Sequence, residues 1–516
     1  MPFGRVISAR KQAFTTNRKF IKQKDMLRKI RIAAAAICFT MITLLFLDFT
    51  GTIHAYMGWL AKIQLLPAVL ALNVGVVVAL VILTLLLGRV YCSVICPLGV
   101  MQDIISWFAG KRKKNRFSYS PAKKWLRYGV LVVFIATLVA GFGAVALLVA
   151  PYSAFGRIAQ NLFAPLWAWG NNLLALVAEK LDSYAFYSTE VVMGSIATFA
   201  VAVVTLIVVG ILAWRGGRTY CNTICPVGTV LGALSRFSLL RPVIDTSKCI
   251  DCKRCARNCK ASCIDVKSHS IDYSRCVACM DCLEMCSKNA ISFTRRASQP
   301  KAAEAPATDS SRRNFIVGAG LLAASAAKAQ EMKLDGGYAT IIDKKAPARQ
   351  NAITPAGSLS AHNMHAHCTG CQLCVAVCPS KVLRPSADLK TFMQPTMSYE
   401  NGYCRPECNK CSEVCPAGAI NPISIAEKSS TQIGHAVWIK DNCVVLTDDV
   451  ECGNCQRHCP AEAITMIRLD ANNPKSKKIP SVNVERCIGC GACENLCPAR
   501  PFSAIYVEGH TNHRTI

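Results

Sequence analysis

The chain contains 516 residues, with 59 Lys and Arg against 31 Asp and Glu, and it has 30 cysteines. Its length allows several domains, and its hydrophobic content of 52% excludes an intrinsically disordered protein. The cysteines stand in tight clusters with metal-ligand spacing, which argues against a secreted disulfide scaffold.

The formal net charge of +28 is concentrated in two basic blocks beside apolar runs. Residues 1–31 hold ten Lys and Arg and one acid, whereas residues 111–127 hold eight and no acid. This is the positive-inside pattern of a membrane protein. No basic stripe interleaved with aromatic residues indicates nucleic-acid binding. We therefore expect membrane lipid, and no nucleic acid, among the partners.

Four apolar runs approach the ~20 residues that a bilayer-spanning helix needs. They cover residues 32–47 (extended to 49), 66–87, 128–150 and 191–214. The basic blocks place the N-terminus and the connection between the second and third runs in the cytoplasm. The sequence therefore predicts a domain of four transmembrane helices over residues 1–244, with the Trp-bearing stretch 166–170 at the membrane interface.

An internal repeat lies within this domain. Residues 88–99 (GRVYCSVICPLG) and 217–228 (GRTYCNTICPVG) are identical at eight of twelve positions. Each copy follows a helix predicted to run inward, so the repeats are parallel. We expect the four thiols of the two Cys-x3-Cys-Pro motifs to converge, as ligands of an additional cofactor or as a thiol/disulfide pair. These thiols belong to Cys92, Cys96, Cys221 and Cys225. The alternative is a motif that serves packing and turn formation alone.

Residues 245–295 contain two Cys-x2-Cys-x2-Cys-x3-Cys runs, the ligand pattern of a two-cluster bacterial ferredoxin. Because the fourth thiol of each run crosses to the other cluster in that fold, two ligand sets are expected. One is Cys249, Cys252, Cys255 and Cys286, and the other is Cys276, Cys279, Cys282 and Cys259. Structural zinc is the alternative, although zinc sites usually combine two ligand pairs. Cys263 is an extra thiol, either free near a cluster or an alternate ligand.

Residues 296–330 form a predicted linker that contains a twin-arginine export signal. Ser311-Arg312-Arg313-Asn314-Phe315 precedes a short apolar run and an Ala-x-Ala sequence at Ala327. This pattern predicts twin-arginine export machinery as a partner and export of the residues that follow. An ordinary cytoplasmic linker with a chance arginine pair is the alternative, and it would leave both cysteine-rich regions in one compartment.

Residues 331–516 carry four more cysteine runs, each ending in Cys-Pro, and predict four more 4Fe–4S clusters. Their sixteen thiols are Cys368, Cys371, Cys374, Cys378, Cys404, Cys408, Cys411, Cys415, Cys443, Cys452, Cys455, Cys459, Cys487, Cys490, Cys493 and Cys497. Spacing does not decide which runs share clusters. We expect a nested arrangement, first with fourth and second with third, in preference to a sequential one. The total is six clusters on 24 cysteines, and Cys38 remains as a buried small hydrophobe.

Other cofactor motifs are missing from the sequence. No Cys-x-x-Cys-His and no glycine-rich nucleotide motif stands out, so we expect no haem, flavin or nicotinamide. A two-electron donor would then have to enter from the membrane as quinol. Asp48 and His54, near the outer end of the first helix, are candidate proton acceptors for it. The alternative role for both is that of interfacial polar residues.

On these motifs, the first 295 residues resemble the NapH-type membrane ferredoxin family, and residues 311–510 resemble the NapG/MauM ferredoxin-type family. The resemblance implies an α-helical membrane domain joined to α+β bacterial-ferredoxin-like domains. It also implies menaquinone as a cofactor and a menaquinol dehydrogenase component that feeds a periplasmic cytochrome or a reductase of the nitrate-reductase type. The two parts are usually separate subunits, and here they are fused.

The same resemblance implies a bacterial inner-membrane protein with residues 245–295 in the cytoplasm and residues 331–516 in the periplasm. Two other functions stay open. One is an accessory role in maturation or reactivation of a redox metalloenzyme. The other is a cytosolic-ferredoxin-linked electron carrier that uses no quinone.

Overall fold

The structure, a computed structural model, describes residues 26–48, 51–112, 117–141, 143–183, 186–189, 196–295, 342–388 and 390–516. The predicted twin-arginine segment lies outside these residues. We call the described part of residues 26–239 the helical bundle, residues 240–295 the small cysteine-rich unit and residues 342–516 the large cysteine-rich unit.

The helical bundle starts with the helix Met26–Leu47. Its remaining helices are α2 (Thr52–Met57), α3 (Trp59–Lys62), α4 (Leu65–Leu70), α5 (Val74–Leu87), the π-helical turn η1 (Tyr91–Ile95), α6 (Pro97–Arg112), α7 (Lys124–Val139), α8 (Gly143–Val149), α9 (Pro151–Ile158), the π-helical turn η2 (Ala159–Phe163), α10 (Ala164–Lys180), α11 (Ile196–Gly216), α12 (Thr219–Thr223) and α13 (Pro226–Ser235). Within the described residues, the first helix and α11 are long and apolar enough to cross a membrane.

The other two predicted runs are each divided into two helices. Residues 66–87 fall into α4 and α5, because Leu72 has φ 52° and Asn73 caps α5 by accepting from the Val76 amide at 3.3 Å. Residues 128–150 fall into α7 and α8, and Gly141 has φ +78° at the break. Neither half alone has the length of a spanning helix.

A buried arginine caps the C-terminal end of α8. The guanidinium of Arg157 donates to the carbonyls of Leu147 and Leu148 at 2.9 and 3.0 Å, and to Ser153 Oγ at 3.2 Å. Pro151 starts α9 directly after α8 and has no amide hydrogen, so the Leu147 carbonyl cannot accept from residue 151 as in a continuous helix. Arg157 therefore supplies the hydrogen bonds that an unbroken helix would have made.

The two repeat segments pack reciprocally. Helix α6 follows the first motif and packs against α11, which precedes the second motif. Helix α13 follows the second motif and packs against α5, which precedes the first. This arrangement places the two Cys-x3-Cys-Pro segments beside each other in the core of the bundle.

The small cysteine-rich unit contains β1 (Leu240–Ile244), α14 (Arg254–Arg257), β2 (Ile264–Asp265), β3 (Ser270–Ile271), α15 (Asp281–Met285) and β4 (Ile291–Arg295). Strands β1 and β4 pair antiparallel, and so do β2 and β3. Ile244 and Ile291 face each other in the first pair and are both buried, so the ends of the unit close over its core.

The large cysteine-rich unit contains α16 (Ala361–His367), α17 (Leu373–Val377), β5 (Leu383–Pro385), β6 (Pro395–Met397), α18 (Lys410–Val414), α19 (Ile425–Ser430), β7 (Thr431–Trp438), the 3-10 turn η3 (Lys440–Asn442), α20 (Val444–Thr447), α21 (Asn454–Arg457), β8 (Ile464–Arg468), β9 (Lys478–Val482), α22 (Ala492–Leu496) and β10 (Ile505–Thr515). The antiparallel pairs are β5–β6, β8–β9 and β7–β10.

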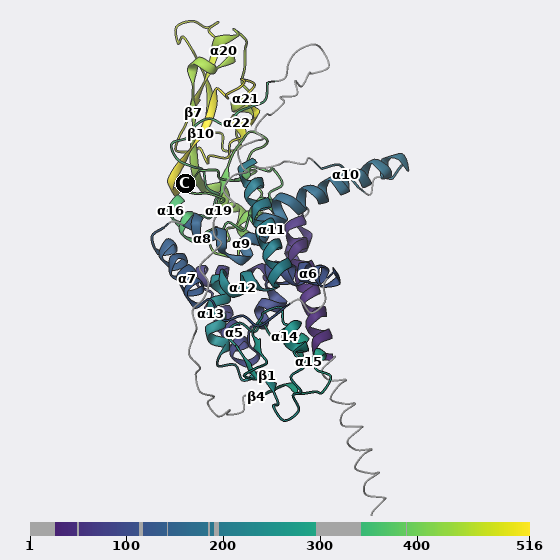
Figure 1. Cartoon of the computed structure of the whole chain (residues 1–516). Helices are drawn as coiled ribbons and strands as arrows, with labels where there is room; N and C mark the ends of the chain where they lie inside the picture. Colours follow the sequence, from purple (N-terminus) through teal and green to yellow (C-terminus); the bar gives the residue numbers. More distant parts are fainter. Residues whose placement is uncertain are drawn as a thin grey trace, which may run out of the picture.

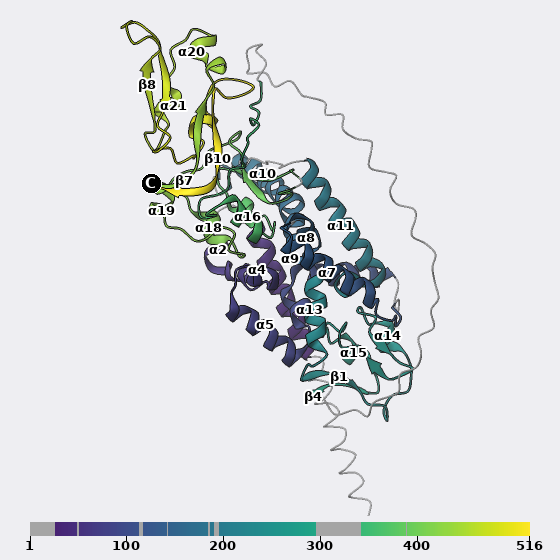
Figure 2. The same ribbon diagram turned by 90° about the vertical axis from the view of Figure 1, so that its left-hand side faces the viewer.

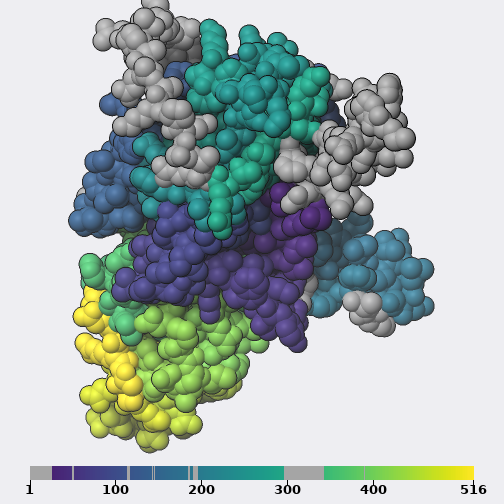
Figure 3. Space-filling model, turned by 90° about the horizontal axis from the view of Figure 1, so that it is seen from below, coloured from purple at the N-terminus to yellow at the C-terminus, as the bar shows by residue number. Residues whose placement is uncertain are grey.

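The two cysteine-rich units lie at opposite ends of the helical bundle (Figures 1 and 2). Strands β1 and β4 mark the lower end in Figure 1, whereas α20 and α21 mark the upper tip. Figure 3 shows the purple and blue bundle between the teal small unit and the green and yellow large unit. Helix α10 projects sideways from the bundle as an arm with exposed apolar side chains, among them Leu166, Trp169 and Leu173.

Candidate metal centres

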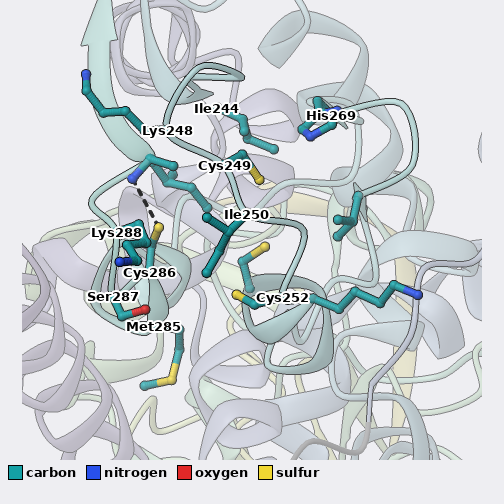
Figure 4. A pocket seen from close by; sticks show the side chains of 15 residues that line it. Ile244, Lys248, Cys249, Ile250, Cys252, His269, Met285, Cys286, Ser287 and Lys288 are labelled. Carbon is teal, nitrogen blue, oxygen red and sulfur yellow. Dashed lines mark hydrogen bonds between the residues drawn. The ribbon is translucent and has the colours of Figure 1, made fainter.

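One cavity of the small unit brings together the thiols of one predicted ligand set. Cys249, Cys252, Cys255 and Cys286 all line it. Figure 4 shows the sulfur atoms of Cys249, Cys252 and Cys286 around this space. The Ala290 amide donates to Cys286 Sγ at 3.1 Å.

The backbone between the cysteines explains this geometry. Asp251 and Lys253 have φ 51° and 59°, and the equivalent Ala278 and Met280 of the second run have φ 49° and 63°. These left-handed residues turn each loop around its cavity, and the short helices α14 and α15 follow directly. The Cys-x2-Cys-x2-Cys spacing therefore sets a wrapped loop and not an extended one.

A second cavity in the same unit collects the other predicted set, Cys259, Cys276, Cys279 and Cys282. Cys263 also lines it, and Cys263 Sγ lies 3.6 Å from Cys259 Sγ. The extra thiol is thus next to the predicted cluster.

The large unit pairs its runs sequentially, so the nested arrangement expected from the sequence is wrong. One cavity is lined by Cys378 of the first run together with Cys404, Cys408 and Cys411 of the second. Reciprocally, Cys415 lies near enough to interact electrostatically with the thiols of Cys368, Cys371 and Cys374.

The third and fourth runs repeat this exchange. One cavity is lined by Cys443, Cys452, Cys455 and Cys497. Cys459 interacts electrostatically with Cys487, Cys490 and Cys493. Runs that are neighbours in sequence therefore exchange their fourth thiols, as the two runs of the small unit do.

These donor sets fit four-iron clusters. Each offers four thiols, the ligands that such clusters use. Within the described residues, the only three potential ligand atoms that all lie within 4.8 Å of one another belong to Cys249, Asp251 and His269. The predicted sets are therefore wider than the coordination sphere of a single zinc ion, whose bonds to sulfur are about 2.3 Å long.

The two halves of the large unit meet at Tyr399. This fully buried ring donates from its hydroxyl to the Gly489 carbonyl at 2.7 Å. A Cβ at Gly491 would lie 2.3 Å from the same ring, so only glycine fits there. The Cys404 amide also donates to the Cys490 carbonyl at 2.9 Å. The thiol sets of Cys404 and Cys490 are therefore neighbours.

The large unit contacts the helical bundle through its first cysteine loop. A Cβ at Gly156 in α9 would lie 2.2 Å from the Cys371 carbonyl oxygen. Ser153 Oγ donates to the Thr369 carbonyl at 2.5 Å. One helix therefore brings a predicted cluster-binding loop into direct contact with the bundle.

The four thiols of the repeat motifs converge in the core of the bundle. Cys92, Cys96, Cys221 and Cys225 are buried, belong to one apolar cluster and lie within electrostatic range of one another. We call them the thiol tetrad. Gln102 donates to Cys221 Sγ at 3.3 Å, and the Gly228 amide donates to Cys225 Sγ at 3.3 Å.

Asp48 and His54 also lie together. His54 Nδ1 is 3.3 Å from Asp48 Oδ2, and Asp48 accepts from the backbone amides of Gly51, Ile53 and His54. Burial lowers the pKa of His54, the contact with Asp48 opposes this shift, and the charge of Lys410 adds to it. His54 Nε2 is buried and has no hydrogen-bond partner in the described part of the chain.

A cavity of ≈ 440 Å³ lies between the helical bundle and the large unit. Phe46 at the end of the first helix, Trp167 of α10 and Phe199 of α11 line its bundle side. Cys378 lines its other side. Gln160 also borders it, with a buried Oε1 that has no hydrogen-bond partner in the described residues. This is a mostly apolar site with polar side chains at its border, which suits a small amphipathic molecule.

Two family models match the chain. A model described as "4Fe-4S binding domain" matches residues 69–115 and 196–244, the two segments that carry the Cys-x3-Cys-Pro motifs. A model described as "4Fe-4S dicluster domain" matches residues 367–444 and 450–500. The second match divides the large unit into two halves, and within each half the two cysteine runs exchange their fourth thiols.

The curated relatives match about two fifths of this chain. Ferredoxin-type protein NapH of Haemophilus influenzae is 28% identical over 195 residues, which is 38% of this chain and 55% of the relative. Putative electron transport protein YccM of Escherichia coli is 25% identical over 38% of this chain and 47% of the relative. Methylamine utilization ferredoxin-type protein MauN of Methylobacillus flagellatus is 25% identical over 33% of this chain and 48% of the relative.

The chain thus spans about half the length of the curated relatives it matches. No solved structure matches it.

Sequence reasoning missed the arginines beside the thiol tetrad and the cavity at Cys378. The arginines had a signal, because Arg89 and Arg218 are identical positions of the repeat. The sequence contains no such signal for the cavity, because its walls come from segments more than 300 residues apart, such as those of Phe46 and Cys378.

Proposed function

Because the chain is a NapH-like ferredoxin-type protein with 4Fe–4S domains, we propose that it is a membrane-anchored menaquinol dehydrogenase component. It takes electrons from menaquinol and delivers them through six 4Fe–4S clusters to a periplasmic reductase of the nitrate-reductase type. Bound clusters of this kind supply one-electron carriers. The 24 cysteines of the six runs hold them.

The observation that carries this proposal is the ≈ 440 Å³ cavity at Cys378. A quinol head group is flat, apolar on its faces and polar at its hydroxyls. Trp167 and Phe199 offer aromatic contact, and the side chains of Gln160 and Asn161 add polar groups at the border of the cavity. The base of the apolar arm α10 borders the cavity, which gives a lipid-soluble molecule a path from the bilayer.

We assign the cavity side of the bundle to the periplasm. Arg28 and Arg31 lie near the start of the first helix and form ion pairs with Asp281 of the small unit. Positive charge at that end agrees with a cytoplasmic small unit. The large unit, at the opposite end, is then periplasmic, exported by the twin-arginine segment of residues 311–329. The four predicted spans include the divided runs α4–α5 and α7–α8.

Asp48 and His54 take the protons that quinol oxidation releases. Asp48 directly follows Leu47, which lines the cavity. Burial lowers the pKa of His54, so its imidazole is neutral near pH 7, and its buried Nε2 is free to accept a proton.

The test is reduction of the purified full chain by a menaquinol analogue, followed in the visible absorbance of the clusters. Ala164→Trp fills the cavity from α10, and it should lower the rate of quinol-driven reduction at least about tenfold while dithionite reduces the clusters as before. Leu174→Trp is the matched control, because Leu174 is an exposed residue further along the same helix.

Two outcomes count against this function. Clusters that dithionite reduces but menaquinol does not would exclude a quinol dehydrogenase. A protease accessibility assay that finds residues 342–516 on the cytoplasmic side of intact cells would exclude delivery to a periplasmic acceptor.

A further inference from the structure

The two thiol cavities of the small unit have different surroundings. Asp281 lines the second cavity and pairs with Arg28 of the first helix at 3.0 Å, so this cavity lies against the helical bundle. The residues that line the first cavity, at Cys249, form no ion pair with the bundle in the described part of the chain. We call the first cavity the outer cavity and the second the inner cavity.

A predicted cluster ligand reaches the protein surface at the outer cavity. Cys252 is the one cysteine of the six runs whose side chain is exposed, and the neighbouring Ile250 has 59% exposure. The rate of electron transfer between two proteins falls steeply with the distance between their redox centres. A soluble carrier therefore comes closest to a predicted cluster site of this chain at Cys252.

Basic side chains surround this exposed thiol. Three lysines line the outer cavity, and two arginines stand in α14, the short helix that follows Lys253. All five residues are exposed. Figure 4 shows Lys288 beside Cys286 at the border of the cavity. We call these five residues the basic rim, which consists of Lys248, Lys253, Arg254, Arg257 and Lys288.

The acidic residues of the small unit leave most of the basic rim without a counter-charge. The unit has ten Lys and Arg and six Asp and Glu. Asp281 and Glu284 are held by Arg28 of the bundle. Asp245 pairs with Lys248 at 2.6 Å. The other four residues of the rim form no ion pair within 4.0 Å in the part of the chain that the structure describes.

Asp251 is the acid closest in sequence to the exposed thiol, and it also has a partner. Its Oδ1 atom lies 2.8 Å from His269 Nε2, at the border of the outer cavity. The surface around Cys252 is therefore positively charged, with the apolar Ile250 near its centre. An apolar centre inside a polar border is the usual composition of a protein–protein interface.

We propose that the basic rim is a docking surface for an acidic one-electron carrier protein. Opposite charges steer such partners together and raise their association rate. Electron-transfer complexes bury less than about 1,200 Å² in total, so a patch of five side chains around one exposed thiol has a suitable size. In the encounter, the reduced carrier loses one electron and the small unit gains it, with no bond or proton transferred.

An anionic lipid surface is the other partner that a cluster of basic residues attracts. The exposed Cys252 favours the carrier, because binding to lipid headgroups needs the charges alone and does not require a redox ligand at the surface. The inference goes beyond the proposed function, since it gives the chain an electron donor other than quinol and holds whether or not quinol is oxidised.

The test is the affinity of the purified full chain for a plant-type [2Fe–2S] ferredoxin, used as an acidic carrier protein and measured by surface plasmon resonance. Saturable binding is expected. Because salt screens charges at exposed sites, the affinity should fall about tenfold or more between about 50 and about 500 mM salt. This measurement needs no variant and no turnover.

A double variant tests the basic rim itself. Lys253→Glu with Lys288→Glu should weaken the binding about tenfold or more, at an iron content equal to that of the parent chain. Lys253→Gln with Lys288→Gln removes the charges without adding acids beside the thiols, and it should give a smaller loss in the same direction. Lys475→Glu with Lys478→Glu is the matched control, because both lysines are exposed and lie on the large unit.

A kinetic measurement separates docking from reduction. Reduction of the chain by reduced ferredoxin should slow in the rim variants and stay unchanged in the control variant. Reduction by the methyl viologen radical should not slow in any of them, because this small cation needs no acidic docking face.

Three outcomes would overturn the proposal. One is a parent chain that shows no saturable binding of the ferredoxin. Another is an equal loss of binding in the rim variant and in the control variant, which would reflect net charge alone. The third is binding of phosphatidylserine vesicles without binding of the ferredoxin, which would assign the basic rim to a lipid surface.

Discussion

Gly156 of α9 and Cys371 of the large unit are in backbone contact, since a Cβ at Gly156 would lie 2.2 Å from the Cys371 carbonyl oxygen. The bundle therefore contacts a predicted cluster-binding loop with no side chain in between. This contact holds the Cys371 loop directly against α9.

The first prediction tests that contact. Gly156→Leu should push the large unit off α9, at a cost of about 1–3 kcal/mol for overpacking, which is about 5- to 150-fold in the docked population. Quinol-driven reduction of the clusters should slow in proportion, with iron content unchanged. Gly170→Leu in α10 is the control, because nothing lies within 4 Å of a Cβ there. Equal rates in both variants would contradict a functional contact.

The second prediction concerns the pairing of runs in the large unit. Cys374 and Cys415 contribute to one site, whereas Cys411 belongs to another. Cys374→Ser with Cys415→Ser should therefore lose one cluster, about four irons. Cys411→Ser with Cys415→Ser should lose two, about eight. The nested pairing predicts two lost clusters for the first double variant, so iron analysis of the two proteins separates the arrangements.

The third prediction concerns the proton acceptor. His54→Gln removes the free Nε2, and a general base contributes about 10²- to 10⁴-fold to such reactions. Menaquinol-driven reduction should slow by at least about a hundredfold, and reduction by dithionite should not change. His362→Gln, an exposed histidine of the large unit, is the control. In the parent chain, the rate should fall as acid protonates His54. A rate for His54→Gln that equals the parent rate would leave Asp48 and His54 as structural residues.

The fourth prediction is a pH dependence of stability. His513 Nε2 forms a hydrogen bond with Thr354 Oγ1, and the two atoms lie 3.0 Å apart. Burial, with a smaller contribution from His510, lowers the pKa of His513 to about 4. In the unfolded chain, His513 binds a proton below its ordinary pKa of about 6.5. In the folded chain, His513 does so only near pH 4. The stabilisation is therefore complete above pH 6.5 and is lost as the pH falls towards 4, by up to about 3 kcal/mol.

The measurement is the half-life of cluster absorbance on mild heating at pH 7.5 and pH 5. His513→Gln should flatten the difference between the two pH values. His362→Gln should preserve it, and it reports the acid sensitivity of the clusters themselves. Identical pH profiles for the parent and His513→Gln would show that His513 does not contribute.

The sequence predicts the thiol sets of the small unit well, because crossing of Cys259 and Cys286 follows from the pattern of two adjacent runs. It does not predict the pairing in the large unit. The spacing gives the number of ligands within a run. It does not show which other run receives the fourth thiol, because that depends on which loops pack together, as the loops of Cys378 and Cys404 do. The four buried motif thiols converge as their repeat indicates. The iron ligation of all these thiols stays a prediction.

The division of the apolar runs shows a different limit. Hydropathy predicts residues 66–87 and 128–150 as continuous helices, since it averages over short interruptions. Asn73 and Gly141 are the local signals for a break, through side-chain capping and a left-handed backbone. The buried Arg157 bonds the carbonyls at the end of α8, and it lies beyond the run 128–150, so the hydropathy of that run gives no sign of it.

The sites of the large unit form a single file. The Cys371 set contacts α9, the Cys404 and Cys490 sets meet at Tyr399, and the Cys443 set lies at the tip with α20 (Figure 1). If each set holds its predicted cluster, such a file would store several reducing equivalents at once. A donor that releases electrons in pairs and an acceptor that takes them one at a time would then not have to react at the same rate. A partner protein that docks on the large unit would have to contact only the Cys443 set at the tip.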